Sequence, residues 1–115
     1  MLRLFNEMGM AMLIPEDKIA ATTALTSCGI AYVLKYIQAA MQAGIEMGIY
    51  PQDGMRMVAQ TVKGAAELIL NNDTHPSVEI DKVCTPGGIT IKGINELEHD
   101  GYTSAIINAI KASKQ

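Results

Sequence analysis

The segment from Pro51 to Asn71 constrains the fold most strongly, because its apolar residues surround most of a helix. A single narrow polar stripe recurs at helical spacing and consists of Arg56, Gln60, Lys63 and Glu67. Aliphatic residues, alanine and methionine occupy most of the remaining helical surface. A helix that packs against one core needs an apolar stripe about 100° wide, and this segment exceeds that width. We therefore expect a helix that is buried on two sides.

A second long helix is predicted from Cys28 to Gly48, where apolar residues follow three-and-four spacing. One row on it is made of the small residues Ala31, Ala39 and Ala43, which lets another helix approach closely. Shorter helices are predicted over residues 17–25, 76–83, 89–99 and 102–112.

No segment alternates convincingly with period two, so no sheet is expected. Residues 1–115 are predicted to form a single all-α domain, a bundle of about five to seven helices. Residues 1–14 are expected to form an arm or a short helix at a truncated start.

The composition narrows the class of protein. A hydrophobic fraction of 49% with 18% charged residues excludes disorder, and the low charge favours burial of part of the exterior in an assembly. The net charge of −3 leaves no basic surface for nucleic acid or for an anionic membrane. Polar residues interrupt the longest apolar stretch, Cys28 to Ile49, so it is not predicted to span a membrane.

Metal and nucleophile chemistry find little support in the sequence. Cys28 and Cys84 have no metal-ligand spacing, and His75 and His99 have no ligand-spaced partners. No signal peptide is visible, so both cysteines are predicted to be reduced thiols in a cytoplasmic protein. We expect no metal site, and no catalytic triad can be assembled.

Residues 85–88 read Thr-Pro-Gly-Gly and come before a predicted helix. Thr85 is predicted to be the N-cap, and no Glu or Gln at Gly88 completes a capping box. The N–H groups of Gly88, Ile89 and Thr90 are then open at the positive end of the helix dipole. Such groups suit a carboxylate or a phosphate, and the Thr90 hydroxyl adds a donor. The alternative is that the glycines only permit a sharp turn or close packing.

A second polar cluster lies between Thr22 and Gly29 and leads into the long helix. The hydroxyls of Thr23, Thr26 and Ser27 either cap that helix or line a pocket. The residues alone leave both interpretations open.

Residues 23–49, 75–83 and 85–113 together resemble the C-terminal domain of pyrroline-5-carboxylate reductase. The likeness extends from about Ile14 to the end of the chain. It is most specific at a Ser/Thr-Pro-Gly-Gly-x-Thr signature, which is Thr85 to Thr90 here. The matching positions that follow are Gly93, Leu97-Glu98 and Gly101-Tyr102.

The resemblance implies that an N-terminal Rossmann domain binds NADPH or NADH and that the helical domain forms an interlocked homodimer. The family reduces the imine of 1-pyrroline-5-carboxylate to L-proline, the last step of proline biosynthesis. The resemblance also implies that the substrate carboxylate is held by Thr85, Gly87, Gly88, Ile89 and Thr90. The positions that face substrate and cofactor are implied to be Thr23, Thr26 and Cys28. Here Cys28 replaces a hydroxyl of the family pattern, and Ile30 replaces a proline.

The sequence contains no G-x-G-x-x-G after a strand, so we expect this chain to lack the Rossmann domain. Alone it is predicted to bind no cofactor tightly and to be inactive as a reductase. One alternative is a stand-alone helical homodimer that binds an anion or a partner without catalysis. Another is the helical half of a different Rossmann-linked reductase that acts on a small carboxylate.

Overall fold

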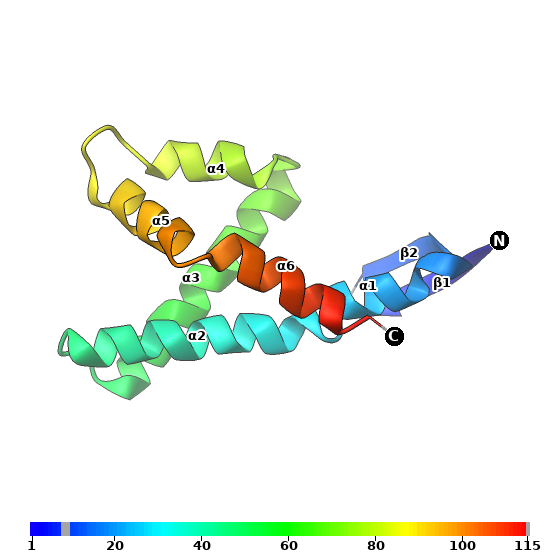
Figure 1. Ribbon diagram of the computed structural model, residues 1–115, viewed down its shortest axis with the longest axis horizontal. Helices are drawn as coiled ribbons and strands as arrows, with labels where there is room; N and C mark the ends of the chain where they lie inside the picture. Colours follow the sequence, from blue (N-terminus) through cyan, green and yellow to red (C-terminus); the bar gives the residue numbers. More distant parts are fainter. Residues whose placement is uncertain (8–9, 115) are drawn as a thin grey trace. The chain divides into compact units, whose positions relative to one another are not determined.

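The computed structural model describes residues 1–7 and 10–114 (Figure 1). In chain order its elements are β1 (Leu2–Glu7), β2 (Met10–Pro15), the 3-10 helix η1 (Glu16–Lys18), α1 (Ile19–Leu25), α2 (Gly29–Glu46), α3 (Pro51–Asn72), α4 (Pro76–Val83), α5 (Ile89–His99) and α6 (Tyr102–Ala112). The described residues thus contain six α-helices, which confirms the predicted all-α bundle. The chain divides into two compact units, Met1–Leu34 with Tyr102–Gln115 and Lys35–Gly101.

The first fifteen residues correct the sequence analysis, because β1 and β2 form an antiparallel hairpin where no sheet was expected. Leu4 lies opposite Leu13, and the Glu16 N–H continues the pairing by donating to the Met1 carbonyl at 2.9 Å. The second strand is apolar throughout, and the first alternates over only three residues, Leu2 to Leu4, so neither gives a sustained period-two signal that would reveal a strand. Residues 8 and 9 of the expected arm or short helix lie outside the described residues.

In the first unit, α1 packs against α6. Ala24 on α1 is 1% exposed and is the single buried hydrophobic residue among those whose burial is described, residues 1–4 and 11–114. The Tyr32 hydroxyl, in the second turn of α2, donates to the Ala109 carbonyl of α6 at 3.2 Å and also contacts the Ser113 hydroxyl. These bonds join the start of α2 to the end of α6.

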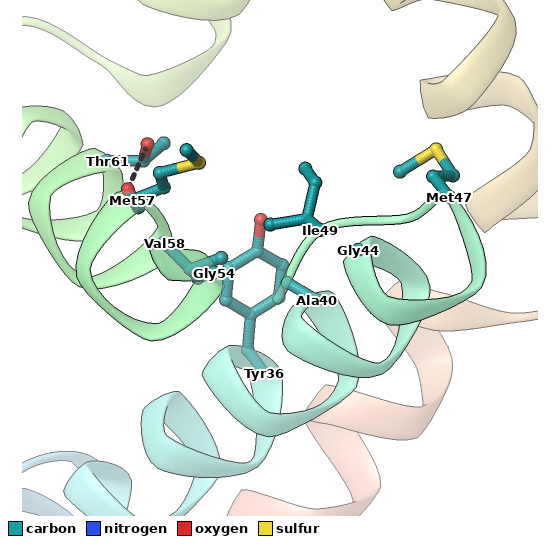
Figure 2. A pocket seen from close by; sticks show the side chains of 9 residues that line it. All are labelled: Tyr36, Ala40, Gly44, Met47, Ile49, Gly54, Met57, Val58 and Thr61. Carbon is teal, nitrogen blue, oxygen red and sulfur yellow. Dashed lines mark hydrogen bonds between the residues drawn. The ribbon is translucent and has the colours of Figure 1, made fainter. Parts of the chain in front are cut away.

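In the second unit, Ile49 fills the corner between α2 and α3 (Figure 2). Gly44 and Gly54 are buried there, and a Cβ added to either would lie 3.7 Å from the Ile49 side chain. The corner also contains a small apolar cavity of about 210 Å³, which is lined by residues that include Ile49, Tyr36 and Met57. Packing at this corner fixes the direction of α3 relative to the adjoining end of α2.

The turn between α3 and α4 is fixed by local caps. Asp73 ends α3 in the left-handed conformation, at φ 51°, and its N–H donates to the Ile69 carbonyl. His75 caps α4, because its Nδ1 accepts a hydrogen bond from the Ser77 N–H at 3.1 Å. The Thr74 hydroxyl donates to Glu79 at 2.5 Å, and this bond lowers the pKa of the Glu79 carboxyl.

The helices of the second unit leave much apolar surface uncovered. On α3 the exposed large hydrophobic residues are Met55, Met57, Leu68 and Leu70, at 42–66%. A groove of about 400 Å³ runs between α3 and α4 and is lined by side chains that include Leu68, Ile69, Ile80 and Val83. The apolar surface predicted on more than one side of α3 is therefore present and open in the single chain.

Candidate functional site

The Thr-Pro-Gly-Gly segment forms a tight turn that ends where α5 begins. The Gly88 N–H donates to the Thr85 carbonyl at 2.9 Å, which closes the turn. Gly87 has φ +72°, a conformation that favours glycine, and a proline before it fits a type II turn. Gly88, with φ −77° and ψ 174°, is the N-cap of α5.

This geometry corrects the predicted cap. Thr85 is not the N-cap of α5, because the positive φ of Gly87 cannot belong to a right-handed helix and the helix starts at Ile89. The N–H of Gly88 is not open either, since it is used within the turn. Gly87 therefore does permit a sharp turn.

Gly88 has a separate requirement for glycine. A Cβ added there would lie 2.5 Å from the Thr85 Oγ1 and 3.1 Å from the Thr85 carbonyl oxygen. The Thr85 side chain therefore lies over Gly88 and takes up the space that any larger residue would need. The absence of a side chain at Gly88 leaves the room that the Thr85 hydroxyl occupies.

The first turn of α5 remains suited to an anion. It contains no acidic residue, and Gly88 offers no capping side chain. The Ile89 side chain is 85% exposed, and Thr90 is exposed beside it. The N–H groups of Ile89 and Thr90 lie at the positive end of the helix dipole, where a carboxylate is favoured.

The hydroxyl cluster of the first unit divides into two parts. The Thr26 hydroxyl donates to the Thr22 carbonyl at 2.8 Å, and the Thr26 N–H donates to the same oxygen at 3.0 Å. Thr26 therefore ends α1, and its single hydroxyl proton is already in use.

Thr23 and Cys28, by contrast, lie together. Both line a cavity of about 300 Å³, whose other lining residues are Ala20 and Ser113. The Cys28 N–H also donates to the Thr23 carbonyl at 3.1 Å. Both cysteines of the chain, Cys28 and Cys84, are free thiols and half-buried.

Ser113 is the lining residue that sequence reasoning missed. It lies 81 residues from Tyr32, its hydrogen-bonding partner, so no local motif links it to the cluster. Thr23, Cys28 and Ser113 belong to the first unit, and residues 85–90 belong to the second.

A metal site and a membrane-spanning helix both lack support among the described residues. Nowhere among them do three metal-ligating side chains gather. In the same part of the chain, no helix is both long enough and apolar enough to cross a membrane.

Comparison with known proteins gives a consistent result. Residues 16–115 match the family model described as pyrroline-5-carboxylate reductase dimerisation. The chain is 49% identical to pyrroline-5-carboxylate reductase 1 of Dictyostelium discoideum over 96% of its own length and 20% of that protein. It is 45% identical to pyrroline-5-carboxylate reductase 2 of the same organism, over 98% of this chain and 38% of that protein.

A solved structure supports the same assignment. The Plasmodium falciparum pyrroline carboxylate reductase, solved with NADP bound, has a TM-score of 0.83 at 32% identity. The match covers 87% of this chain and 40% of that one. The chain therefore spans well under half the length of these relatives. With the family model matched over residues 16–115, the chain belongs to the pyrroline-5-carboxylate reductase dimerisation family.

Proposed function

We propose that this chain is the dimerisation and substrate-carboxylate part of a pyrroline-5-carboxylate reductase. The reaction transfers a hydride from NADPH or NADH to the imine carbon of 1-pyrroline-5-carboxylate and gives L-proline, the last step of proline biosynthesis. The observation that carries the proposal is the family match over residues 16–115, which includes the turn and helix start at residues 85–90.

The substrate carboxylate is proposed to bind at the start of α5. The N–H groups of Ile89 and Thr90 and the hydroxyls of Thr85 and Thr90 supply donors for an anion. Gly87 shapes the turn, and Gly88 leaves room for the Thr85 side chain. The exposed Ile89 side chain fits a role in which only its backbone N–H is used.

The cavity with Thr23 and Cys28 is proposed to face the reacting part of the site. The family resemblance implies the same role for Thr26, but its hydroxyl proton is donated to the Thr22 carbonyl, so the Thr26 hydroxyl offers only an acceptor. No residue of this chain is assigned a catalytic proton transfer.

The described residues do not form a dinucleotide-binding fold. Their two strands form one antiparallel hairpin, and no glycine-rich loop connects a parallel strand to a helix. We place the main NADPH or NADH site outside these residues and expect no tight cofactor binding by this chain alone.

Self-association is the second part of the proposal. The exposed apolar side chains on α3 and the groove between α3 and α4 are the kind of surface that is buried in an interface. A second copy of this chain offers apolar surface of the same kind to bury them. The family is itself named for dimerisation. Interfaces of obligate dimers bury more than roughly 2,000 Å². We therefore propose an interlocked homodimer, or a multiple of it.

The proposed compartment is the cytoplasm, because both thiols are free and disulfides are rare there. No nucleic-acid or membrane partner is proposed, given the net charge of −3. A stand-alone homodimer without catalysis is not favoured, because the relatives that match are reductases.

The test is a steady-state assay of the native, full-length protein that carries these residues. Loss of NADPH absorbance with 1-pyrroline-5-carboxylate, together with chromatographic detection of L-proline, is the expected result. Absence of proline formation by a folded protein would contradict the proposal. The 115-residue chain expressed alone is expected to give no turnover.

A further inference from the structure

The cavity of the first unit has one wall formed by the far end of the chain. Ser113 follows α6 directly and lines the cavity with Ala20, Thr23 and Cys28. The sequence resemblance assigned functional positions only to the Thr23 and Cys28 side of this space. Ser113 supplies a hydroxyl from another element.

Two groups hold that hydroxyl in place, the Ala109 carbonyl and the Tyr32 hydroxyl. The Ser113 Oγ donates to the Ala109 carbonyl at 3.0 Å, and the Tyr32 hydroxyl donates to the same carbonyl at 3.2 Å. The two hydroxyls also hydrogen-bond to each other. The serine oxygen is thus fixed by a partly buried triangle of bonds between α2 and α6, which a freely rotating surface serine lacks.

Proton counting then decides what Ser113 offers to the cavity. A serine has one proton and two acceptor lone pairs. In this structure the Ser113 hydroxyl donates its proton to the Ala109 carbonyl, so that proton is used. The Tyr32 hydroxyl can donate to the Ser113 oxygen, which leaves that oxygen one further lone pair. With its proton on the Ala109 carbonyl, Ser113 keeps an acceptor lone pair and has no proton to give to the cavity.

We propose that Ser113 is a specificity-determining residue of this cavity, where its oxygen accepts a hydrogen bond from an N–H group of a bound reactant. This inference rests on the proposed function. Two reactants carry such a group: the nitrogen of the substrate ring in its protonated form, and the carboxamide of the nicotinamide. A ligand group that can only accept is disfavoured, because it would face a lone pair.

The test compares Ser113→Ala with wild type in the native, full-length protein, with KM measured separately for each reactant. Loss of one hydrogen bond predicts a KM raised about threefold to tenfold for one reactant. A rise for 1-pyrroline-5-carboxylate identifies the ring N–H as the donor, and a rise for NADPH identifies the carboxamide.

Three further variants separate this role from a structural one. Ser113→Thr keeps the hydroxyl and should restore KM. Tyr32→Phe leaves the Ser113 oxygen and its bond to Ala109, so KM should change less than in Ser113→Ala. Ser104→Ala removes an exposed serine hydroxyl elsewhere on α6 and should leave KM unchanged.

The outcomes are distinguishable. If the wild type is active and both KM values of a folded Ser113→Ala variant stay within about twofold of the wild-type values, the inference is wrong and the proposed function stands. An equal rise in both KM values, unrescued by threonine and matched by a lower melting temperature, also overturns it. An inactive wild type overturns the proposed function and the inference together.

Discussion

Replacing Gly88 by alanine tests how the signature turn is built. The added Cβ would lie 2.5 Å from the Thr85 Oγ1 and 3.1 Å from the Thr85 carbonyl oxygen. The first contact is too short for any real methyl group, so the Thr85 side chain must rotate away. The second contact requires the turn itself to shift by a few tenths of an ångström, because the closing bond from the Gly88 N–H to that oxygen is 2.9 Å.

The expected effect follows from the proposed role of Thr85. A hydrogen bond to a charged group is worth about 1.5–3 kcal/mol. Losing the one from the Thr85 hydroxyl to the substrate carboxylate should raise KM for 1-pyrroline-5-carboxylate by roughly tenfold to a hundredfold. KM for NADPH should change little, because the proposed contact is to the substrate alone.

Two matched glycine variants serve as controls. Gly93→Ala lies inside α5 with nothing within 4 Å of the added Cβ, so it should leave KM unchanged and raise stability slightly. Gly87→Ala also meets nothing within 4 Å, but φ +72° makes it cost roughly 1–2 kcal/mol through strain alone. These variants separate steric displacement of Thr85 from helix and backbone effects.

The assay is steady-state kinetics in the native, full-length enzyme, with thermal melts of each variant. If Gly88→Ala leaves KM for 1-pyrroline-5-carboxylate as low as Gly93→Ala does, the Thr85 hydroxyl does not hold the carboxylate. The glycines would then serve the turn alone.

Three further predictions concern assembly, recognition and pH. Sedimentation of the protein at micromolar concentration should show a dimer or a multiple of one, and a folded monomer would refute the interface on α3 and α4. Thr90→Val, which deletes one hydroxyl and nearly preserves the shape, should raise KM for 1-pyrroline-5-carboxylate about tenfold or more without a change in melting temperature; an unchanged KM excludes that hydroxyl from the site. The Thr74 bond lowers the pKa of Glu79, so its stabilising effect is present above the ordinary carboxyl pKa and is lost as the pH falls through the lowered value. Melting curves in acid should therefore show a smaller pH dependence for Glu79→Gln than for wild type, and identical curves would contradict this.

The sequence predicts the helices well where proline and periodicity mark them. The helix expected from residue 89 to residue 99 is α5, with the same bounds, and the one expected from Pro51 to Asn71 is α3, which ends at Asn72. Their polar stripes and terminal prolines or glycines are local signals, so no knowledge of packing is needed.

Residues 1–15 show where such signals fail. An apolar run without alternation does not distinguish a strand from a helix, and pairing of Leu4 with Leu13 depends on the partner strand. The prediction for residues 85–88 is wrong for a different reason. Proline and glycine suit both a type II turn and the first turn of a helix, and only the φ of Gly87 separates the two.

The cavity in the first unit was predictable on one side only. Thr23 and Cys28 lie close in sequence, and the polar cluster there indicated a pocket as one of two interpretations. Ser113 reaches the same cavity through hydrogen bonds to Ala109 and Tyr32, and the bond to Tyr32 spans 81 residues. Such a contact depends on how α6 packs, which periodicity does not specify.

The central claim is that the start of α5 holds the carboxylate of the substrate and product. The most direct test follows the backbone amide resonances of Ile89 and Thr90 in the native, full-length protein during titration with L-proline. Pyrrolidine, which keeps the ring and lacks the carboxylate, is the matched control. We predict that both amides shift with L-proline and stay in place with pyrrolidine. Equal shifts with both compounds, or no shift at either amide while L-proline binds elsewhere, would contradict the account.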